Sequence, residues 1–327
     1  MMSKHVNIAV IGGAKIADRS ILPAIRGLSE LYELVGVACR DQEKAIQFAT
    51  RHETKPFSDY EALLDSKPLD AVYIPLPNAM HGEWIRKALE RGLHVLVEKS
   101  LTCSYEETLR LNRFAEKMGL ALVENFQFRF HSQLAAINKV LSDGVIGEIR
   151  CIRSSFGFPP FPDQENIRYQ SELGGGALLD AGAYPIKISQ YFLGNDLTVA
   201  AANLVYDLNK KVDIWGGAYL KQRYGECFAE IAFGFDNFYQ CNLEIWGSKG
   251  KVYTHRIFTA PPNLAPELIL ETASGTETLK LKADHSFENM LRHFHMLVKN
   301  KQGMSTEYEQ NVSQARLIDE LRSKAQP

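Results

Sequence analysis

Hydrophobic and polar positions follow two different patterns along this chain, and the change falls near residue 125. Before it, short apolar runs predict strands at residues 6–11, 34–39, 70–75, 94–97 and 120–124. Amphipathic stretches between them predict helices at residues 16–28, 42–51, 60–64, 79–90 and 105–118. Strands that alternate with helices of this length are typical of βαβ units, so we predict a parallel sheet with right-handed crossovers.

Residues with strong end preferences support these helix boundaries. Asn78 is predicted to cap one helix, and Gly92 to end it. Ser104 is predicted to cap the next helix, with Glu107 three residues later completing a capping box. We therefore predict a Rossmann-type, doubly wound α/β domain at residues 1–124.

After residue 125 the pattern favours an antiparallel sheet. A helix is predicted at residues 133–141, followed by strands at residues 148–156, 199–208, 215–221, 227–235, 238–246 and 251–255. Many of these strands alternate in polarity, which is typical of an open, mostly antiparallel sheet with one covered face. A glycine-rich helix at 174–193 lies within this region, and two helices with apolar stripes close the chain. Residues 125–327 are thus predicted to form an α+β domain for substrate binding and oligomerisation.

Composition and charge narrow the range of possible functions. The chain has 327 residues, 45% hydrophobic and 23% charged, which is ordinary for a globular protein of two domains. A net charge of −2 offers no basic field, so we expect neither nucleic acid nor a membrane as a partner. Five scattered cysteines without CxxC spacing, and no signal peptide, predict a reduced cytoplasmic protein. His293 and His295 point apart on a helix, so no metal site is predicted.

The junction after the first strand predicts a dinucleotide site. Against the fingerprint G-x-G-x-x-G, Gly12 takes the first place, Ala14 the second and Ala17 the third. The methyl group of Ala14 should push a pyrophosphate slightly outward. Gly12-Gly13 alone is as compatible with a plain turn, but its position at the first strand–helix junction favours dinucleotide binding.

The end of the second strand selects the cofactor. Domains that prefer NAD usually carry an acidic residue there, whereas this chain has Arg40. A guanidinium suits stacking on adenine and pairing with a 2′-phosphate, and Arg19 could assist. We therefore predict NADP(H) over NAD(H). The alternative is that Arg40 is a solvated loop residue and Asp41 only caps the next helix.

Further cofactor contacts are expected along the same edge. The turn after the third strand should form a rigid rim over the pyrophosphate and the nicotinamide ribose, and His81 is expected to be a rim or capping residue rather than a catalytic base. The remaining predicted cofactor-binding residues are Lys15, Ile16, Pro75, Leu76, Pro77, Asn78, Glu98, Lys99 and Asn125.

Two distant segments carry the candidate chemistry. Residues 95–99 form an apolar run that ends in Glu98-Lys99, at the edge where open α/β sheets bind ligands. In the glycine-rich segment, Asp180 and Tyr184 are four residues apart and share a helical face. If that face looks at Lys99, an ammonium, a phenol and a carboxylate surround one cleft, which suits a carbonyl oxygen that becomes an alkoxide. The alternatives are a surface Lys99 paired with Glu98, and a half-buried structural Tyr184.

These segments together resemble the Gfo/Idh/MocA family of oxidoreductases. The matching segments are residues 11–17, 22–24, 73–78, 81–84, 95–99 and 174–186. Within the family the chain is most similar to NADPH-dependent nucleotide-sugar (dTDP-sugar) 3-ketoreductases of deoxysugar biosynthesis. The segments that carry this closer likeness are residues 124–126, 143–150, 167–170 and 258–262.

The resemblance implies NADPH-dependent reduction of a keto group, at carbon 3, of a nucleotide-diphospho-sugar. Lys99 would stabilise the growing oxyanion and Tyr184 would supply the proton, while Asp180 would orient the lysine or bind a sugar hydroxyl. Arg129, Arg168 and Tyr169 are expected to join Asp180 and Tyr184 in binding substrate. An open antiparallel sheet also suggests a homodimer or homotetramer.

Two departures from the family pattern affect these expectations. Ser100 replaces the proline of Glu-Lys-Pro, whose peptide bond is commonly cis. A non-proline cis bond costs about 3 kcal/mol, so a trans Lys99–Ser100 bond with a shifted lysine is one outcome. Tyr184 stands where many relatives have histidine. A phenol with an ordinary pKa near ~10 donates a proton better than it accepts one, which favours reduction over oxidation.

Two other functions remain open at this point. The first is a dehydrogenase of free sugars or trans-dihydrodiols, which would turn over substrates without a nucleotide. The second is a non-catalytic, NADP-sensing regulator, which would bind the cofactor without using it. The presence of Lys99, Asp180 and Tyr184 together argues against the regulator.

Overall fold

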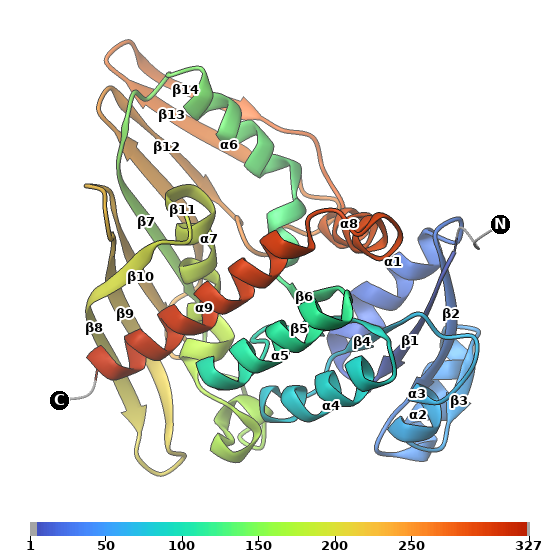
Figure 1. Cartoon of the computed structure of the whole chain (residues 1–327). Helices are drawn as coiled ribbons and strands as arrows, with labels where there is room; N and C mark the ends of the chain where they lie inside the picture. The colour runs from blue at the N-terminus through green and yellow to red at the C-terminus, as the bar shows by residue number, and fades with distance from the viewer. Residues whose placement is uncertain (1–4, 326–327) are drawn as a thin grey trace. The chain divides into compact units, whose positions relative to one another are not determined.

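The computed structural model describes residues 5–325, which divide into two compact units (Figure 1). The first unit comprises residues 5–125 with Phe287–Val312, and the second comprises Phe126–Ser286 with residues 313–325. The predicted domain division kept residues 125–327 together, whereas here Asn125 and Phe287–Val312 lie with the first unit.

Buried hydrogen bonds explain why this late segment joins the first unit. The Tyr32 hydroxyl donates to the Leu291 carbonyl at 2.6 Å, and the Tyr308 hydroxyl donates to the Leu120 carbonyl at 2.6 Å. These contacts join residues more than 180 positions apart in the chain. Helix periodicity in the sequence could not reveal such pairings, because it reports only which face of a helix is apolar.

The first unit is built on a six-stranded parallel sheet with strand order β3-β2-β1-β4-β5-β6. Its strands are β1 (Val6–Ile11), β2 (Tyr32–Ala38), β3 (Lys55–Phe57), β4 (Ala71–Ile74), β5 (His94–Glu98) and β6 (Leu122–Asn125). The strand order reverses between β1 and β4, and the carboxyl ends flanking such a switch point are where doubly wound sheets bind ligands. The short edge strand β3 was not predicted, because only three residues pair and none is buried.

Apart from the first, the helices that connect these strands follow their predicted bounds closely. They are α1 (Leu22–Gly27), α2 (Gln42–Arg51), α3 (Tyr60–Leu64), α4 (Asn78–Glu90) and α5 (Tyr105–Met118). The Ser104 side chain caps α5 as predicted, accepting from the Glu107 N–H. The predicted cap at Asn78 is wrong, since Pro77 occupies the N-cap position and Asn78 is the first helical residue. A π-helical turn, Ala17–Ile21, precedes α1 and divides the helix that was predicted there.

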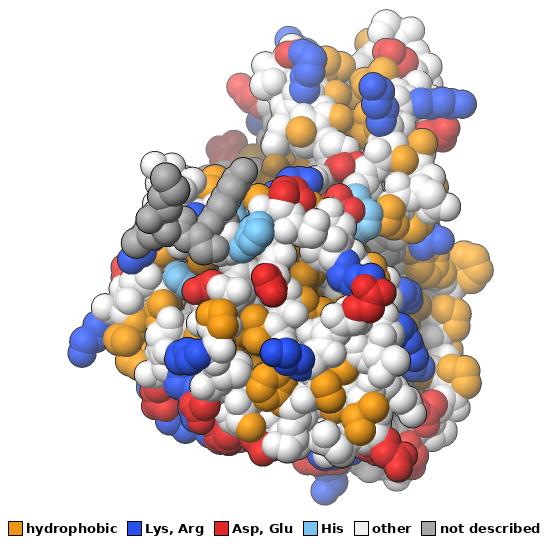
Figure 2. Space-filling view, turned by 90° about the vertical axis from the view of Figure 1, so that its right-hand side faces the viewer, with side chains coloured by type: hydrophobic (Ala, Val, Ile, Leu, Met, Phe, Trp, Pro, Cys, Tyr) orange, Lys and Arg blue, Asp and Glu red, His pale blue; other side chains and the backbone are white. Residues whose placement is uncertain are grey.

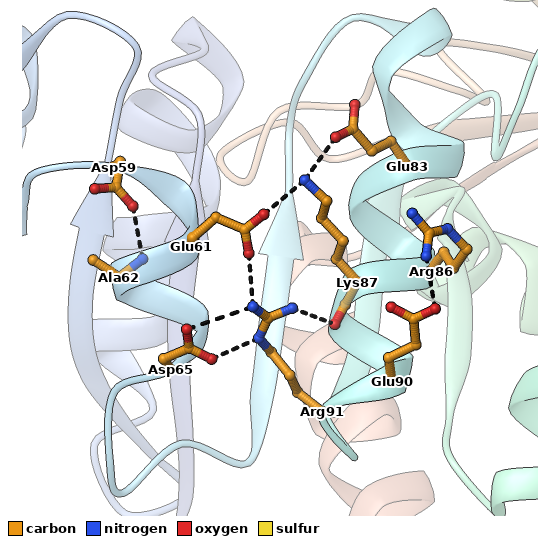
Figure 3. Close-up of polar contacts among 9 residues, drawn as sticks. All are labelled: Asp59, Glu61, Ala62, Asp65, Glu83, Arg86, Lys87, Glu90 and Arg91. Carbon is orange, nitrogen blue, oxygen red and sulfur yellow. Dashed lines mark hydrogen bonds and ion pairs between the residues drawn. The ribbon is translucent and has the colours of Figure 1, made fainter.

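An ion-pair network ties α3 to α4 (Figure 3). Arg91 contacts Asp65 and Glu61 at 2.7 Å each, and Lys87 contacts Glu61 at 2.6 Å and Glu83 at 2.7 Å. Exposed ion pairs are weak singly and contribute more as a network. The network fixes the helix whose first turn follows the candidate cofactor rim.

The second unit is built on an eight-stranded sheet with strand order β14-β13-β12-β11-β7-β10-β9-β8. Its strands are β7 (Ile149–Gly157), β8 (Leu197–Asp207), β9 (Val212–Gln222), β10 (Phe228–Gly234), β11 (Gln240–Gly247), β12 (Gly250–His255), β13 (Glu267–Thr272) and β14 (Gly275–Lys280). Only β7 and β10 pair in parallel, so the sheet is mostly antiparallel, as predicted. The hairpin β13–β14 was not predicted.

The two faces of this sheet differ as the alternating pattern requires. One face is buried and includes Ile152, Leu220 and Ile245, whereas the other exposes Trp215 and Trp246. Helix α7 (Ala183–Leu193) packs against β7 and β10. A π-helical turn, Leu178–Gly182, precedes α7, so the single helix predicted at 174–193 is divided.

The remaining helices are α6 (Ser132–Ser142), α8 (Ser286–Asn300) and α9 (Met304–Lys324), and the division between the units falls within α9 after Val312.

Acidic and basic side chains are interspersed over the face shown in Figure 2. Across residues 5–325, no helix has both the length and the apolar character that a bilayer span requires.

Candidate active site

The first candidate half-site lies in the first unit, where the chain leaves β1. Gly12 has a φ of 125°, a conformation that favours glycine. A β-carbon there would lie 2.9 Å from Leu76 Cδ2 and 3.2 Å from the Pro75 carbonyl oxygen. Glycine therefore allows the turn after β1 to approach the loop after β4 across the switch point.

Basic side chains gather on the same edge. A β-carbon on Gly13 would lie 2.7 Å from Lys44 Cε and 2.9 Å from Cys39 Sγ, so the lysine stem crosses over the glycine turn. Arg40 follows β2 and is exposed. Backbone N–H groups of a glycine turn together with nearby cations are the donor set that phosphate groups require, so this edge fits a phosphorylated dinucleotide. Sequence reasoning missed Lys44, whose signal was its place one turn into α2.

His81 is fully buried beside this edge rather than exposed on it. Its Nδ1 lies 2.8 Å from the Ser100 carbonyl oxygen, and its Nε2 lies 2.7 Å from the Leu76 carbonyl oxygen. Burial lowers the pKa of His81, although both carbonyls favour the protonated ring. The ring thus joins the loop after β4 to the loop after β5. A direct cofactor contact by His81 stays a prediction.

Glu98 is held by neighbours on two strands. Its Oε1 accepts a hydrogen bond from the Tyr73 hydroxyl at 2.6 Å and another from the Asn125 amide at 2.7 Å. Burial raises the pKa of Glu98, while these donors and the adjacent Lys99 charge oppose the rise. The carboxyl ends of β4, β5 and β6 are therefore joined through one carboxyl group.

Lys99 follows β5 directly and is half-buried. The Lys99–Ser100 peptide bond is cis, so the trans alternative considered from the sequence is wrong. The Leu101 N–H donates to Glu124 Oε1 at 2.8 Å and anchors the loop that follows. The lysine is thus carried on a backbone fixed on both sides.

The second candidate half-site lies in the second unit, around Tyr184 in the first turn of α7. Its ring contacts four phenylalanine rings, with centroid separations of 5.5 Å to Phe126, 5.9 Å to Phe128, 4.9 Å to Phe156 and 5.4 Å to Phe258. Edge and tilted contacts of this kind are favourable aromatic arrangements. They fix the plane of the phenol, and the phenylalanines that do so were not identified from the sequence.

Arg168 and Asp180 form a close ion pair next to this ring. Arg168 Nε lies 2.5 Å from Asp180 Oδ2, and the carboxylate side chain is only 15% exposed. The Asp180 charge raises the pKa of Arg168, and Tyr184 and Tyr169 contribute to the same shift. The structure therefore brings together four of the five predicted substrate residues.

Phenylalanine residues contact the remaining predicted substrate residues. The Arg168 guanidinium lies 4.7 Å from the Phe161 ring, and the Tyr169 hydroxyl accepts from the Phe161 N–H at 3.0 Å. Arg129 lies in the 3-10 turn Gln127–Phe130, with its guanidinium 5.1 Å from the Phe130 ring. Its part in substrate binding stays a prediction. Across residues 5–325, no three His, Cys, Asp or Glu side chains group as a metal site would.

Comparisons with known proteins agree with the division of the chain into two units. A family model described as "Oxidoreductase family, NAD-binding Rossmann fold" matches residues 6–126, and one described as "GFO/IDH/MocA C-terminal domain" matches residues 134–253. The dTDP-3,4-didehydro-2,6-dideoxy-alpha-D-glucose 3-reductase of Actinomadura kijaniata is 39% identical over 98% of this chain and 96% of that protein. The protein of the same name from Saccharopolyspora spinosa is 41% identical over 86% of this chain and 84% of its own.

A solved structure is similar over the same extent. It is that of KijD10, a 3-ketoreductase from Actinomadura kijaniata in complex with NADP and TDP-benzene. Its TM-score is 0.94 at 39% identity, covering 98% of this chain and 97% of that chain.

Proposed function

The chain belongs to the Gfo/Idh/MocA family of NAD(P)-dependent oxidoreductases, and on that premise we propose that it reduces the 3-keto group of a dTDP-linked sugar with NADPH. The observation that carries the proposal is near-full-length similarity to proteins named as dTDP-sugar 3-reductases. The presence of Lys99, Asp180 and Tyr184 at the motif positions supports an active enzyme.

NADPH, when bound, supplies the hydride. The residues proposed to hold it are those of the turn after β1, the rim after β4, and Arg40 for the 2′-phosphate. A glycine turn that admits close backbone approach, with cations beside it, supports this assignment.

Lys99 and Tyr184 are proposed to act on the same carbonyl oxygen. The Lys99 ammonium stabilises the negative charge that grows on that oxygen, and the Tyr184 hydroxyl delivers the proton. The Arg168–Asp180 pair is proposed to bind sugar hydroxyls, because a guanidinium supplies hydrogen-bond donors and a carboxylate supplies acceptors. These roles agree with reduction rather than oxidation as the favoured direction.

The test is turnover of a dTDP-linked 3-keto-sugar, followed by NADPH absorbance, with the variants Lys99→Ala and Tyr184→Phe. Each variant should lose about 10²–10³-fold in kcat, as removal of one such donor typically does. Exposed residues provide matched controls in Lys117→Ala and Tyr224→Phe. Full kcat in the Lys99→Ala/Tyr184→Phe double variant would refute the roles. Turnover of free sugars alone would refute the nucleotide-sugar assignment.

The exposed sheet face is proposed to pair with a second copy of the chain. Trp215 and Trp246 are 43% and 50% exposed on it, and apolar side chains exposed together on one face can mark a protein–protein interface. Arg153 lies between them in the sheet and contacts Glu230 at 2.7 Å and Glu244 at 3.1 Å. Mixed charges framed by aromatic rings suit a self-complementary interface.

Sedimentation velocity tests this pairing. Trp246→Glu should convert an oligomer to a monomer, because it would bury an unpaired charge in the interface. Phe238→Glu, in the exposed turn between β10 and β11, is the control and should leave the oligomer intact. A wild-type monomer would contradict the proposal.

A further inference from the structure

Asp213 is a buried carboxylate in the second unit, and no role for it was predicted from the sequence. It lies in β9, within the apolar run Val212–Trp215, and its side chain is largely buried. Its Oδ2 accepts the Leu178 N–H at 2.5 Å, and the Ala177 N–H lies close enough to lower the pKa of the carboxyl group. These two N–H groups open the π-helical turn that leads into α7.

The glycine-rich loop is shaped around this carboxylate. Gly176 has a φ of 109°, and a β-carbon on it would collide with Asp213 Oδ1. Glycine is therefore required at 176 both by the backbone conformation and by the space that Asp213 occupies. The carboxylate thus sits against the loop on one side and against the start of the helical segment on the other.

The glycine-rich loop is hydrogen-bonded to the backbone of both residues of the Arg168–Asp180 ion pair. The Gly176 N–H donates to the Arg168 carbonyl at 2.9 Å, and the Asp180 N–H donates to the Gly176 carbonyl at 3.2 Å. Gly176 therefore joins the backbone of Arg168 to the turn that carries Asp180. A group that holds Gly176 and Leu178 in place therefore also holds Arg168 and Asp180 in position relative to each other.

Neighbouring groups act on the pKa of Asp213 in both directions. An anion at the start of a helical segment is stabilised by the unpaired N–H groups there. Arg322, on α9, favours the charged form of Asp213, and Tyr206, on β8, is paired with Asp213 across the two strands. Burial raises the pKa of Asp213, and the N–H donors and Arg322 oppose that rise.

We propose that Asp213 is a positioning residue for the reduction: by clamping the start of the helical segment, it sets Tyr184 and the Arg168–Asp180 pair in their working arrangement. The proposal rests on the proposed function, in which Asp180 and Tyr184 face the substrate. Asp213 does not itself touch the reacting atoms.

The variant Asp213→Asn tests the clamp at nearly constant volume. An asparagine keeps one acceptor oxygen for the Leu178 N–H, but it removes the negative charge and places an N–H₂ group where the second carboxylate oxygen lies against Gly176. We expect kcat for the dTDP-linked keto-sugar to fall about 10–100-fold, as when a buried charge-assisted hydrogen bond is lost. NADPH affinity, measured by fluorescence titration, should stay within about two-fold, because the proposed cofactor residues belong to the first unit.

Hydrogen exchange measures the clamp without substrate. Amides 177 and 178 should exchange at least about ten-fold faster in Asp213→Asn than in the wild type, since their acceptor is altered. Asp236→Asn, at an exposed position in the turn after β10, is the matched control and should change neither exchange nor kcat. Gly176→Ala is the second variant, because it displaces the carboxylate without removing it, and the same pattern is expected.

A double variant separates positioning from a merely structural effect. If Asp213 acts through the phenol and its neighbours, adding Asp213→Asn to Tyr184→Phe should cost less than about three-fold more kcat, a strongly non-additive result. Unchanged kcat in Asp213→Asn, or fully multiplicative losses, would overturn the proposal. A wild type that reduces no dTDP-linked keto-sugar would count against the proposed function, and exchange at 177 and 178 would still decide whether the clamp exists.

Discussion

The ion pair between Arg168 and Asp180 allows a quantitative prediction about the candidate site. The variant Arg168→Met removes the guanidinium but keeps a long apolar side chain, and it leaves the Asp180 carboxylate, which is 15% exposed, without its 2.5 Å partner. The complementary variant Asp180→Asn keeps the shape and removes the negative charge. If the pair works as one unit in holding substrate, either change should disable it.

The size of the effect follows from the geometry. A hydrogen bond between charged groups contributes about 1.5–3 kcal/mol. The Arg168 side chain is 35% exposed, so solvent screens the pair and the lower part of that range applies, about 1.5–2 kcal/mol. At roughly 1.4 kcal/mol per factor of ten, kcat/KM should fall about 10–30-fold in each single variant.

The assay is a double-mutant cycle on kcat/KM for the dTDP-linked keto-sugar at saturating NADPH. The double variant should lie within about three-fold of the worse single variant, because the second change removes an interaction already lost. Arg223→Met breaks an exposed pair with Asp196 at 3.1 Å and is the control, expected to change kcat/KM by less than about two-fold. Multiplicative losses in the double variant would refute the reasoning.

Three further predictions follow from single residues. Arg40→Ala should remove most of the NADPH preference measured as a ratio of kcat/KM values, and a strong wild-type preference for NADH would contradict the cofactor assignment. Gly12→Ala should weaken NADPH binding in a fluorescence titration by more than about ten-fold, because its β-carbon would meet Leu76; unchanged affinity would contradict the fit. Burial holds the pKa of His94 at about 4, below its ordinary 6.5, so the unfolded chain takes up the proton first as the pH falls. His94 should therefore cost nothing above pH ~6.5 and roughly 2 kcal/mol of stability by pH ~5, a loss that urea unfolding should show in the wild type but not in His94→Asn.

Much of the fold was predictable because local forces determine it. Residues 42–51 and 60–64 form helices with the predicted bounds, and the Asp41 and Asp59 side chains cap them. The strands β1, β4 and β5 were recognisable as continuous apolar runs, since parallel strands are covered on both faces. Elements without buried residues were missed, and β14 is the clearest case, because none of its residues is buried and only its pairing with β13 defines it.

Part of the candidate site was likewise predictable from the sequence, and part was known only from the structure. Lys99, Asp180 and Tyr184 could be selected from the sequence, because their residue types and motif spacing already indicate carbonyl chemistry. The phenylalanine rings around Tyr184, the carbonyls that hold His81, and the cis bond after Lys99 became known only from the tertiary structure. The sequence by itself determined which groups can react, since chemistry resides in the side chain. Only folding decided what holds those groups in place, because the hydrogen bonds and ring contacts that do so join residues that are not neighbours along the chain.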